Sequence, residues 1–164
     1  VAFRFRCEPR YFYSIQLGSF NFPLEVMFLA RRVEFSASHV CAQVGVSLDE
    51  NLAIYGEAAN PNGHGHNYAL EVTLSGTPDP ITGMVFDLKR LKEVLSREVI
   101  EPMDHRNLNH EVPPFDTVVP TVENIAVEIW RRLSPQLQME NASLYRVRLY
   151  ETEDLYVDYH GEAS

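Results

Sequence analysis

The chain has few cysteines, few basic residues and no long apolar run. Of its 164 residues only Cys7 and Cys41 are cysteines. These are too few for a disulfide framework, so a reducing compartment, the cytoplasm, is expected. Lys and Arg number 14 against 23 Asp and Glu, and the net charge is -9. This charge argues against nucleic acid and anionic membranes as partners, and no apolar segment is long enough to span a bilayer.

The composition is that of one globular domain preceded by an unusual segment. Hydrophobic residues make up 45% and charged residues 23% of the chain, whose length allows a single buried core. Residues 1–27 are rich in Phe and Tyr, with arginines interspersed, and lack the apolar block of a signal peptide. We therefore expect residues 1–27 to be an N-terminal extension, and residues 28–164 to form the main domain.

Hydrophobic alternation predicts several strands. The clearest follows His66, where large apolar residues alternate with smaller or polar ones, as in a half-buried strand; the apolar set is Tyr68, Leu70, Val72 and Leu74. Other strands are expected at Met27–His39, at Leu144–Glu151, at Leu155–His160, and at an antiparallel return that starts at Met84–Phe86.

Three segments carry helix signals. Ser47 and Glu50 form a capping box, and the short helix that it opens should stop near Gly56. Asp87 can cap a second helix, and a third starts around Thr121. Each of the latter two has an apolar stripe: Leu88, Leu91, Leu95 and Val99 in one, and Ile125, Ile129 and Leu133 in the other. Antiparallel strands with helices on one face predict an α+β domain.

Three histidines suggest a metal site. In an extended segment alternate side chains share a face, so His64 and His66 can reach one ion, and Gly65 between them lets another backbone come close. With His39 as a third imidazole, one tetrahedral position stays open, which is the arrangement of a catalytic zinc. The alternative is three unrelated histidines, because a His-x-His pattern alone is weak.

Two further segments offer acid–base or anchoring groups. Asp104 precedes His105, and a carboxylate can orient an imidazole for proton transfer near neutral pH, although such dipeptides commonly just make turns. Glu151 ends a strand face that it is expected to share with Tyr145, Val147 and Leu149. A carboxylate there needs donors, either two parallel N–H groups of a ligand or an Arg of the protein, unless it is simply exposed.

Five segments in order make the chain resemble the pyruvoyl-tetrahydropterin synthase family, which also contains the carboxy-tetrahydropterin synthases of queuosine biosynthesis. They are Phe35–His39, Asn60–Tyr68, Asp104–Asn109, Thr121–Asn124 and Tyr150–Thr152. The animal-type pyruvoyl synthase is more similar, because the approach to the paired histidines, residues 60–63, matches it. The resemblance implies a tunnelling fold (T-fold), with an antiparallel four-stranded sheet and two helices on one face, assembled as a dimer of trimers into a homohexamer with a barrel.

The same resemblance implies roles for single residues. His39, His64 and His66 would hold Zn²⁺, with Mg²⁺ as a candidate companion of a triphosphate substrate. Glu151 would grip the amino edge of a pterin, and Thr121 and Glu123 match positions near the pterin pocket; in a first helical turn Glu123 is also favoured by the helix dipole alone. Asp104 and His105 match a proton relay.

One position departs from the family pattern. The animal-type enzymes carry a catalytic cysteine in the loop before the paired histidines, and its position here is Ala58. Ala58 is an engineered substitution that traps substrate, or Glu57 supplies the base instead, or the chain is a pterin-binding paralogue with little synthase activity. Cys41 does not occupy the family position, and a buried, inert thiol is the favoured interpretation of it.

The expected function is a zinc-dependent carbon–oxygen lyase. It would act on 7,8-dihydroneopterin triphosphate and eliminate triphosphate to give 6-pyruvoyl-tetrahydropterin or a related 6-substituted pterin. The alternatives are a zinc- and pterin-binding protein without turnover, and a side-chain-cleaving enzyme that yields 6-hydroxymethyl-dihydropterin or 6-carboxy-tetrahydropterin.

Overall fold

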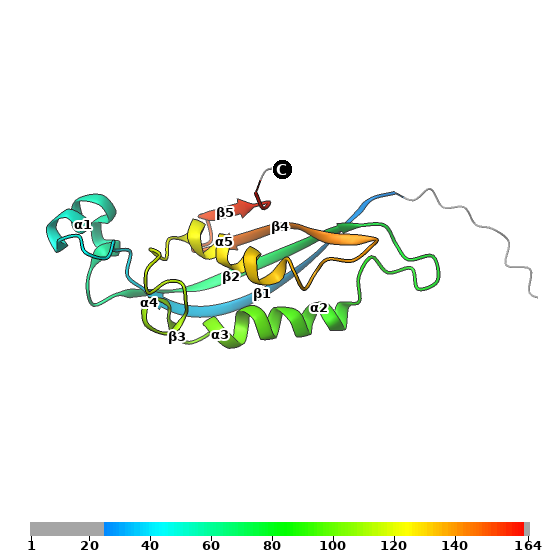
Figure 1. The fold of residues 1–164 in the computed structure, drawn as a ribbon, viewed down its shortest axis with the longest axis horizontal. Helices are drawn as coiled ribbons and strands as arrows, with labels where there is room; N and C mark the ends of the chain where they lie inside the picture. The colour runs from blue at the N-terminus through cyan, green and yellow to red at the C-terminus, as the bar shows by residue number, and fades with distance from the viewer. Residues whose placement is uncertain (1–24, 163–164) are drawn as a thin grey trace, which may run out of the picture.

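A computed structural model describes residues 25–162, which form a twisted sheet with helices packed along one face (Figure 1). Residues 1–24 lie outside this description, and with them nearly all of the predicted N-terminal extension; Met27 already begins the first strand. No helix in the described part of the chain is both long and apolar enough to cross a membrane.

The sheet has five strands in the order β3-β1-β2-β4-β5. The long strands β1 (Met27–His39) and β2 (His64–Gly76) pair antiparallel, and β4 (Ala142–Tyr150) and β5 (Tyr156–Tyr159) continue the sheet on the far side of β2. The fifth strand, β3 (Arg106–Asn107), runs parallel to β1. The prediction of a purely antiparallel, four-stranded sheet was therefore wrong, because a two-residue strand is too short to show any alternation.

The strand predicted to start at Met84–Phe86 was also wrong. These residues lie in a loop before a helix, and the strand that returns beside β2 is β4, after both main helices. The loop is tied to other turns by hydrogen bonds, since Asp79 N–H donates to the Met84 carbonyl and the Asn141 side chain donates to the Val85 carbonyl. Val85 and Phe86 are apolar because they are buried in the core.

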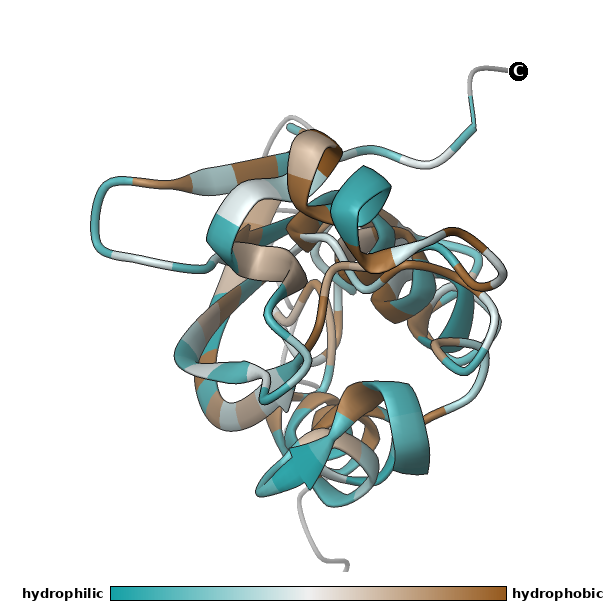
Figure 2. Ribbon diagram, turned by 90° about the vertical axis from the view of Figure 1, so that its left-hand side faces the viewer, coloured by the Kyte–Doolittle hydropathy of each residue, from teal (hydrophilic) through white to brown (hydrophobic). Residues whose placement is uncertain are grey.

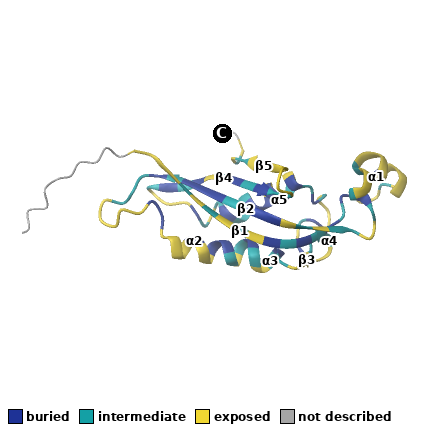
Figure 3. Ribbon diagram, turned by 180° about the vertical axis from the view of Figure 1, so that it is seen from behind, coloured by how far each residue is buried: buried dark blue, intermediate teal, exposed yellow. Residues whose placement is uncertain are grey.

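Two helical segments cover one face of the sheet, as predicted (Figure 1). The first is α2 (Leu88–Leu95), continued by a π-helical turn, η2 (Ser96–Ile100), and by α3 (Glu101–Met103); the second is α5 (Val122–Leu133). Asp87 and Thr121 cap α2 and α5 by accepting from backbone N–H groups. The predicted stripes are buried against the sheet from Leu91 onward in the first segment and throughout α5, whereas Leu88, predicted on the first stripe, is 51% exposed (Figures 2 and 3).

The remaining helices are short. The capping box of Ser47 and Glu50 starts α1 (Leu48–Tyr55), which ends at Gly56 as expected and continues into the 3-10 turn η1 (Gly56–Ala59). α1 projects beyond one end of the sheet and is largely exposed (Figures 1 and 3). α4 (Leu108–Glu111) follows β3. The loop from α1 to β2 thus leads straight into the paired histidines.

Candidate metal centre and active site

The three predicted histidines come together where β1 ends and β2 begins. His39 and His64 are directly paired across the two strands, and His66 lies two residues along β2 on the same face. Each imidazole offers one nitrogen, and these nitrogens all lie within 4.8 Å of one another. The ring centroids of His39 and His64 are 4.4 Å apart, and those of His64 and His66 are 4.9 Å apart. The predicted convergence is therefore present.

Gly65 keeps the two strands close at this point. A Cβ atom at residue 65 would lie 3.2 Å from the Ala37 carbonyl oxygen, which is tighter than ordinary van der Waals contact. A side chain there would push β2 away from β1 and separate His66 from His39. The expected role of this glycine, a close backbone approach, is confirmed.

Burial and one hydrogen bond determine the chemical state of His39. Its side chain is 1% exposed, and its Nδ1 lies 2.7 Å from the Pro120 carbonyl oxygen. A carbonyl can only accept, so the ring proton is on Nδ1 and the Nε2 lone pair is free to face the cluster. Burial, the largest effect, lowers the pKa of His39 to about 4. His39 is therefore a neutral nitrogen donor at physiological pH.

The other two histidines also suit a metal ion. Nδ1 of His64 and Nε2 of His66 are buried without a hydrogen-bond partner among the described residues, and burial lowers the pKa of His66 as well. Unpaired buried nitrogens are costly unless something binds them. Three imidazoles that converge in this way fit a divalent transition metal that favours nitrogen ligands.

Glu151 lies beside the histidine cluster. Its Oε1 is 3.7 Å from Nε2 of His66 and 3.8 Å from Nε2 of His39, and its side chain is 16% exposed. No Arg lies within ion-pair distance of it in the described part of the chain. The carboxylate therefore has neither the Arg partner nor the open exposure that the alternative interpretations required, and it remains available to a ligand.

A β-bulge corrects the predicted face of β4. Leu144 pairs with Leu74 and Arg146 pairs with Thr73, so Tyr145 is an extra residue between them. The alternation had predicted that Tyr145 shares a face with Val147 and Leu149. Because of the bulge, Tyr145 is instead 42% exposed, whereas Val147 and Leu149 are buried. One inserted residue moves the side chains before it to the opposite face of the sheet from the one that simple alternation predicts. Such a bulge leaves no clear mark in a single sequence.

Asp104 and His105 form a pair that is hydrogen-bonded to Ser36 of β1. Asp104 Oδ1 accepts from the Ser36 N–H at 2.8 Å, and Oδ2 lies 2.9 Å from Nδ1 of His105. The Ser36 hydrogen bond, the largest effect, lowers the pKa of Asp104. His105 adopts a left-handed backbone conformation, with φ of 57°, and donates its own N–H to the Ser36 carbonyl. Its side chain is 82% exposed.

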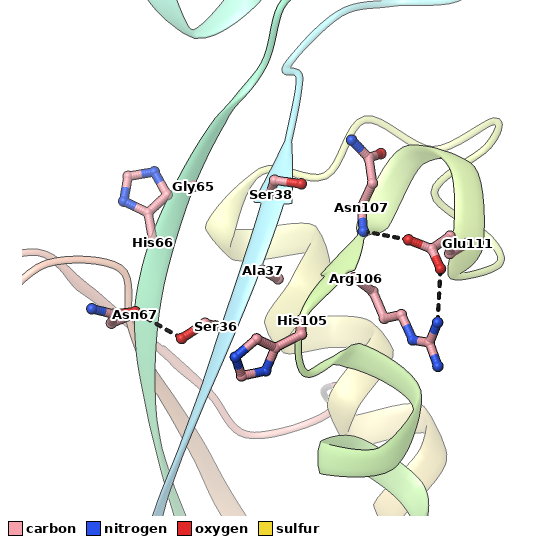
Figure 4. Close-up of a pocket in the computed structure, with 10 residues that line it drawn as sticks. All are labelled: Ser36, Ala37, Ser38, Gly65, His66, Asn67, His105, Arg106, Asn107 and Glu111. Atoms are coloured by element: carbon pink, nitrogen blue, oxygen red, sulfur yellow. Dashed lines mark hydrogen bonds and ion pairs between the residues drawn. The ribbon is translucent and has the colours of Figure 1, made fainter.

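His105 and His66 line the same open cavity, of about 550 Å³, beside β1 and β3 (Figure 4). On the side of β1 and β2 the cavity is lined by Ser36, Ser38 and Asn67 among others, and the Ser36 hydroxyl donates to the Asn67 side chain across the two strands. On its other side Glu111 accepts from Arg106 and from the Asn107 N–H (Figure 4). His105 and His66 thus both border the cavity, and no hydrogen bond or ion pair among the described residues joins the relay to the histidine cluster.

Thr121 and Glu123 lie next to the carbonyl that orients His39. Thr121 caps α5, directly after Pro120, and Glu123 occupies the first turn. Cys41 lies on the same side: its Sγ is 3.9 Å from Nδ1 of His39 and 3.8 Å from the Pro120 oxygen. Burial first, and then the charges of Glu151 and Glu123, raise the pKa of Cys41 to about 11. This thiol lies away from the free nitrogen of His39 and suits the inert role expected of it.

Glu57 and Ala58 both lie in η1. The Ala58 carbonyl accepts from the Cys41 N–H at 2.9 Å, so this turn runs alongside the segment that follows His39. The Glu57 side chain is exposed, and it makes no hydrogen bond or ion pair with another described residue. Within one chain, therefore, the structure does not bring Glu57 into contact with the cluster.

Sequence reasoning missed two groups that touch His39. Pro120, 81 residues away, supplies the carbonyl that binds Nδ1 of His39, and no pattern in the sequence predicts this contact. The Tyr68 hydroxyl lies 3.3 Å from Nε2 of His39. Tyr68 follows His64 and His66 at the same spacing of two, so the alternation that selected the histidines also places Tyr68 on their face.

Comparisons with known proteins agree with this arrangement. A family profile described as 6-pyruvoyl tetrahydropterin synthase matches residues 28–162. The chain is 47% identical over 134 residues to the 6-pyruvoyl tetrahydrobiopterin synthase of Pongo abelii and 46% identical to that of Homo sapiens, in each case with 82% of this chain and 91% of the relative covered. The solved Caenorhabditis elegans 6-pyruvoyl tetrahydropterin synthase superimposes with a TM-score of 0.80 at 38% identity, covering 86% of this chain and 99% of that one.

Proposed function

Because the chain belongs to the 6-pyruvoyl tetrahydropterin synthase family, we propose that it is a zinc-dependent lyase that acts on 7,8-dihydroneopterin triphosphate. The observation that carries the proposal is the placement of one available carboxylate, Glu151, within 4 Å of two of three converging imidazoles. Metal ligands and a ligand anchor thus share one small site.

His39, His64 and His66 would hold the ion. Zinc suits them because it binds three imidazole nitrogens readily and leaves one position open. When bound, it would polarise the oxygens of the substrate side chain and make the neighbouring C–H groups more acidic. The Pro120 carbonyl holds His39 in the tautomer that such binding needs.

Glu151 would orient the substrate. A pterin presents an N–H and an amino group side by side, and a carboxylate can accept from both. Because Glu151 lies beside the histidines, a pterin bound to it in this way would direct the substrate side chain toward them. This arrangement explains why a half-buried carboxylate with no Arg partner is present at the end of β4.

Asp104 and His105 would move the proton. Asp104 accepts from Nδ1–H of His105, so Nε2 is left to take a proton from the substrate side chain and to return it. The side chain then tautomerises, and triphosphate leaves with the electrons of its C–O bond. Because His105 is 82% exposed, we further propose that a second copy covers it in a homohexamer. Light scattering that showed a monomer at micromolar concentration would contradict this assembly.

Ala58 supports a second candidate, a zinc- and pterin-binding protein without turnover. The test is to incubate the protein with zinc and dihydroneopterin triphosphate and to identify the released pterin by chromatography. Formation of 6-pyruvoyl-tetrahydropterin supports the synthase, a hydroxymethyl- or carboxy-pterin supports the side-chain-cleaving alternative, and binding without product supports the second candidate. Metal-free protein is the control.

Variants identify the base. If the missing thiol limits the rate, Ala58→Cys should raise product formation by about 10²–10⁴-fold, the contribution of a positioned acid–base group. If Glu57 has replaced the thiol, Glu57→Gln should abolish activity and leave zinc bound. Cys41→Ala tests the thiol beside His39 and should change little. If neither Ala58→Cys nor Glu57→Gln changes the rate of product formation, the proton transfer would be assigned to Asp104 and His105.

A further inference from the structure

Tyr68 is a buried hydroxyl between the metal ligands and the proposed substrate anchor. Its side chain is fully buried, and its ring is stacked on Phe35, with 5.1 Å between ring centroids. The ring also meets His39 and His66 edge-on, at centroid distances of 6.2 and 5.6 Å. Packing on these sides holds the ring in place, with its hydroxyl beside His39.

That hydroxyl has two acceptors and only one proton. It lies 3.3 Å from Nε2 of His39, and Oε1 of Glu151 lies 3.8 Å from the same nitrogen, so the carboxylate is the other acceptor beside the hydroxyl. Nε2 of His39 is unprotonated because Nδ1 donates to the Pro120 carbonyl. Without a metal, the phenol can therefore donate either to His39 or to Glu151.

A metal ion on His39 removes this choice. It would use the same Nε2 lone pair, and the phenol would then have only the carboxylate to donate to. A hydroxyl left without an acceptor in this fully buried place would be costly, so the hydrogen bond to Glu151 would form. A carboxylate held in this way is positioned before a ligand arrives, which lowers the ordering cost of binding.

We propose that Tyr68 is the positioning residue of Glu151, and that metal binding at His39 commits its hydroxyl to that carboxylate. Metal occupancy would thereby be coupled to the affinity for any ligand that donates to Glu151. This inference rests on the proposed function to the extent that Glu151 is the pterin anchor. Nothing in it requires Tyr68 to touch the substrate or to lose its proton.

The test measures binding rather than turnover. The probe is 6-methylpterin, whose side chain has no hydroxyl to ligate the metal, titrated into metal-free and zinc-loaded protein. For each protein, the ratio of the probe affinity with zinc to the probe affinity without zinc is measured. This ratio should be about tenfold smaller in Tyr68→Phe than in the native protein, because a hydrogen bond to a charged group is lost. Comparing the two ratios cancels the effect of the zinc charge itself, which acts in both proteins.

The zinc affinity of the same variant separates positioning from support of the fold. Tyr68→Phe should bind zinc at least as tightly as the native chain, because the phenol proton no longer competes for Nε2 of His39. Tyr156→Phe is the matched control: Tyr156 is on the edge strand β5, is half exposed, and should change neither affinity. A variant that keeps the native ratio, or that loses more than about tenfold in zinc affinity, overturns the proposal.

A structure of the zinc-loaded native chain decides the matter if Tyr68→Phe does not fold. The Tyr68 oxygen should lie about 2.5–2.7 Å from a Glu151 oxygen, as in a charge-assisted hydrogen bond. A hydroxyl that donates elsewhere in that structure overturns the proposal. If the native chain binds zinc but no pterin, the proposed function fails, while this distance still supports or overturns the coupling of Tyr68 to the metal.

Discussion

Lowering the pH should destabilise the metal-free protein through His39. The folded chain keeps this imidazole neutral, with a pKa of about 4, against an ordinary value of 6.5. The unfolded chain therefore takes up the proton first as the pH falls. The stabilisation is fully present above about pH 6.5 and is lost progressively toward pH 4.

The magnitude follows from the size of the shift. Each pKa unit corresponds to about 1.4 kcal/mol, so a shift of about 2.5 units makes the folded state about 3 kcal/mol less stable at pH 4 than at pH 7. Because His39 is 1% exposed, solvent screening does not reduce this figure. The same neutrality leaves the Nε2 lone pair available to a metal at mildly acidic pH.

Urea unfolding in the presence of a chelator measures the effect. The midpoint and slope are recorded between pH 7 and pH 4 for the native chain and for His39→Gln. Other groups also titrate in this range, such as His66, whose pKa burial lowers too, so the difference between the two proteins isolates His39. If the free energies of unfolding of both proteins fall in parallel, the burial argument for His39 is refuted.

Three further predictions concern single side chains. Glu151→Gln puts an amide where the pterin also donates, and should weaken pterin binding by about 1–3 kcal/mol; an unchanged dissociation constant would make the carboxylate structural. Glu128, which is buried, accepts from Arg131 and Arg132. Glu128→Gln breaks these ion pairs and should lower the free energy of unfolding by about 1–3 kcal/mol, because Arg131 is largely exposed and can be solvated; a loss below about 1 kcal/mol in urea would show that the arginines find other partners. Leu70→Ala, at a fully buried position, should cost about 2–5 kcal/mol in the same assay, and a smaller loss would mean that the core closes around the cavity.

The local features of the fold could be read directly from the chain. The first strand, the α1 capping box and the helices after Asp87 and Thr121 lie where alternation, caps and apolar stripes predicted them. These signals work because each depends on residues within one or two turns of each other. The shared face of His64 and His66 is local in the same sense, and so the pair could be recognised as two of the three ligands of a metal site.

The contacts that complete the site could not be read in this way. His39 meets His64 because β1 and β2 pair, its proton is held by Pro120, and its free nitrogen lies near Glu151, which follows β4. A hydrogen bond across 81 residues leaves no periodic trace, because any carbonyl can accept. The two-residue strand β3 and the bulge at Tyr145 were missed for a related reason: both are set by the neighbouring strand. The sequence alone determined which side chains can carry the chemistry, and the tertiary structure decided which of them meet, since only packing brings distant segments within a few ångströms.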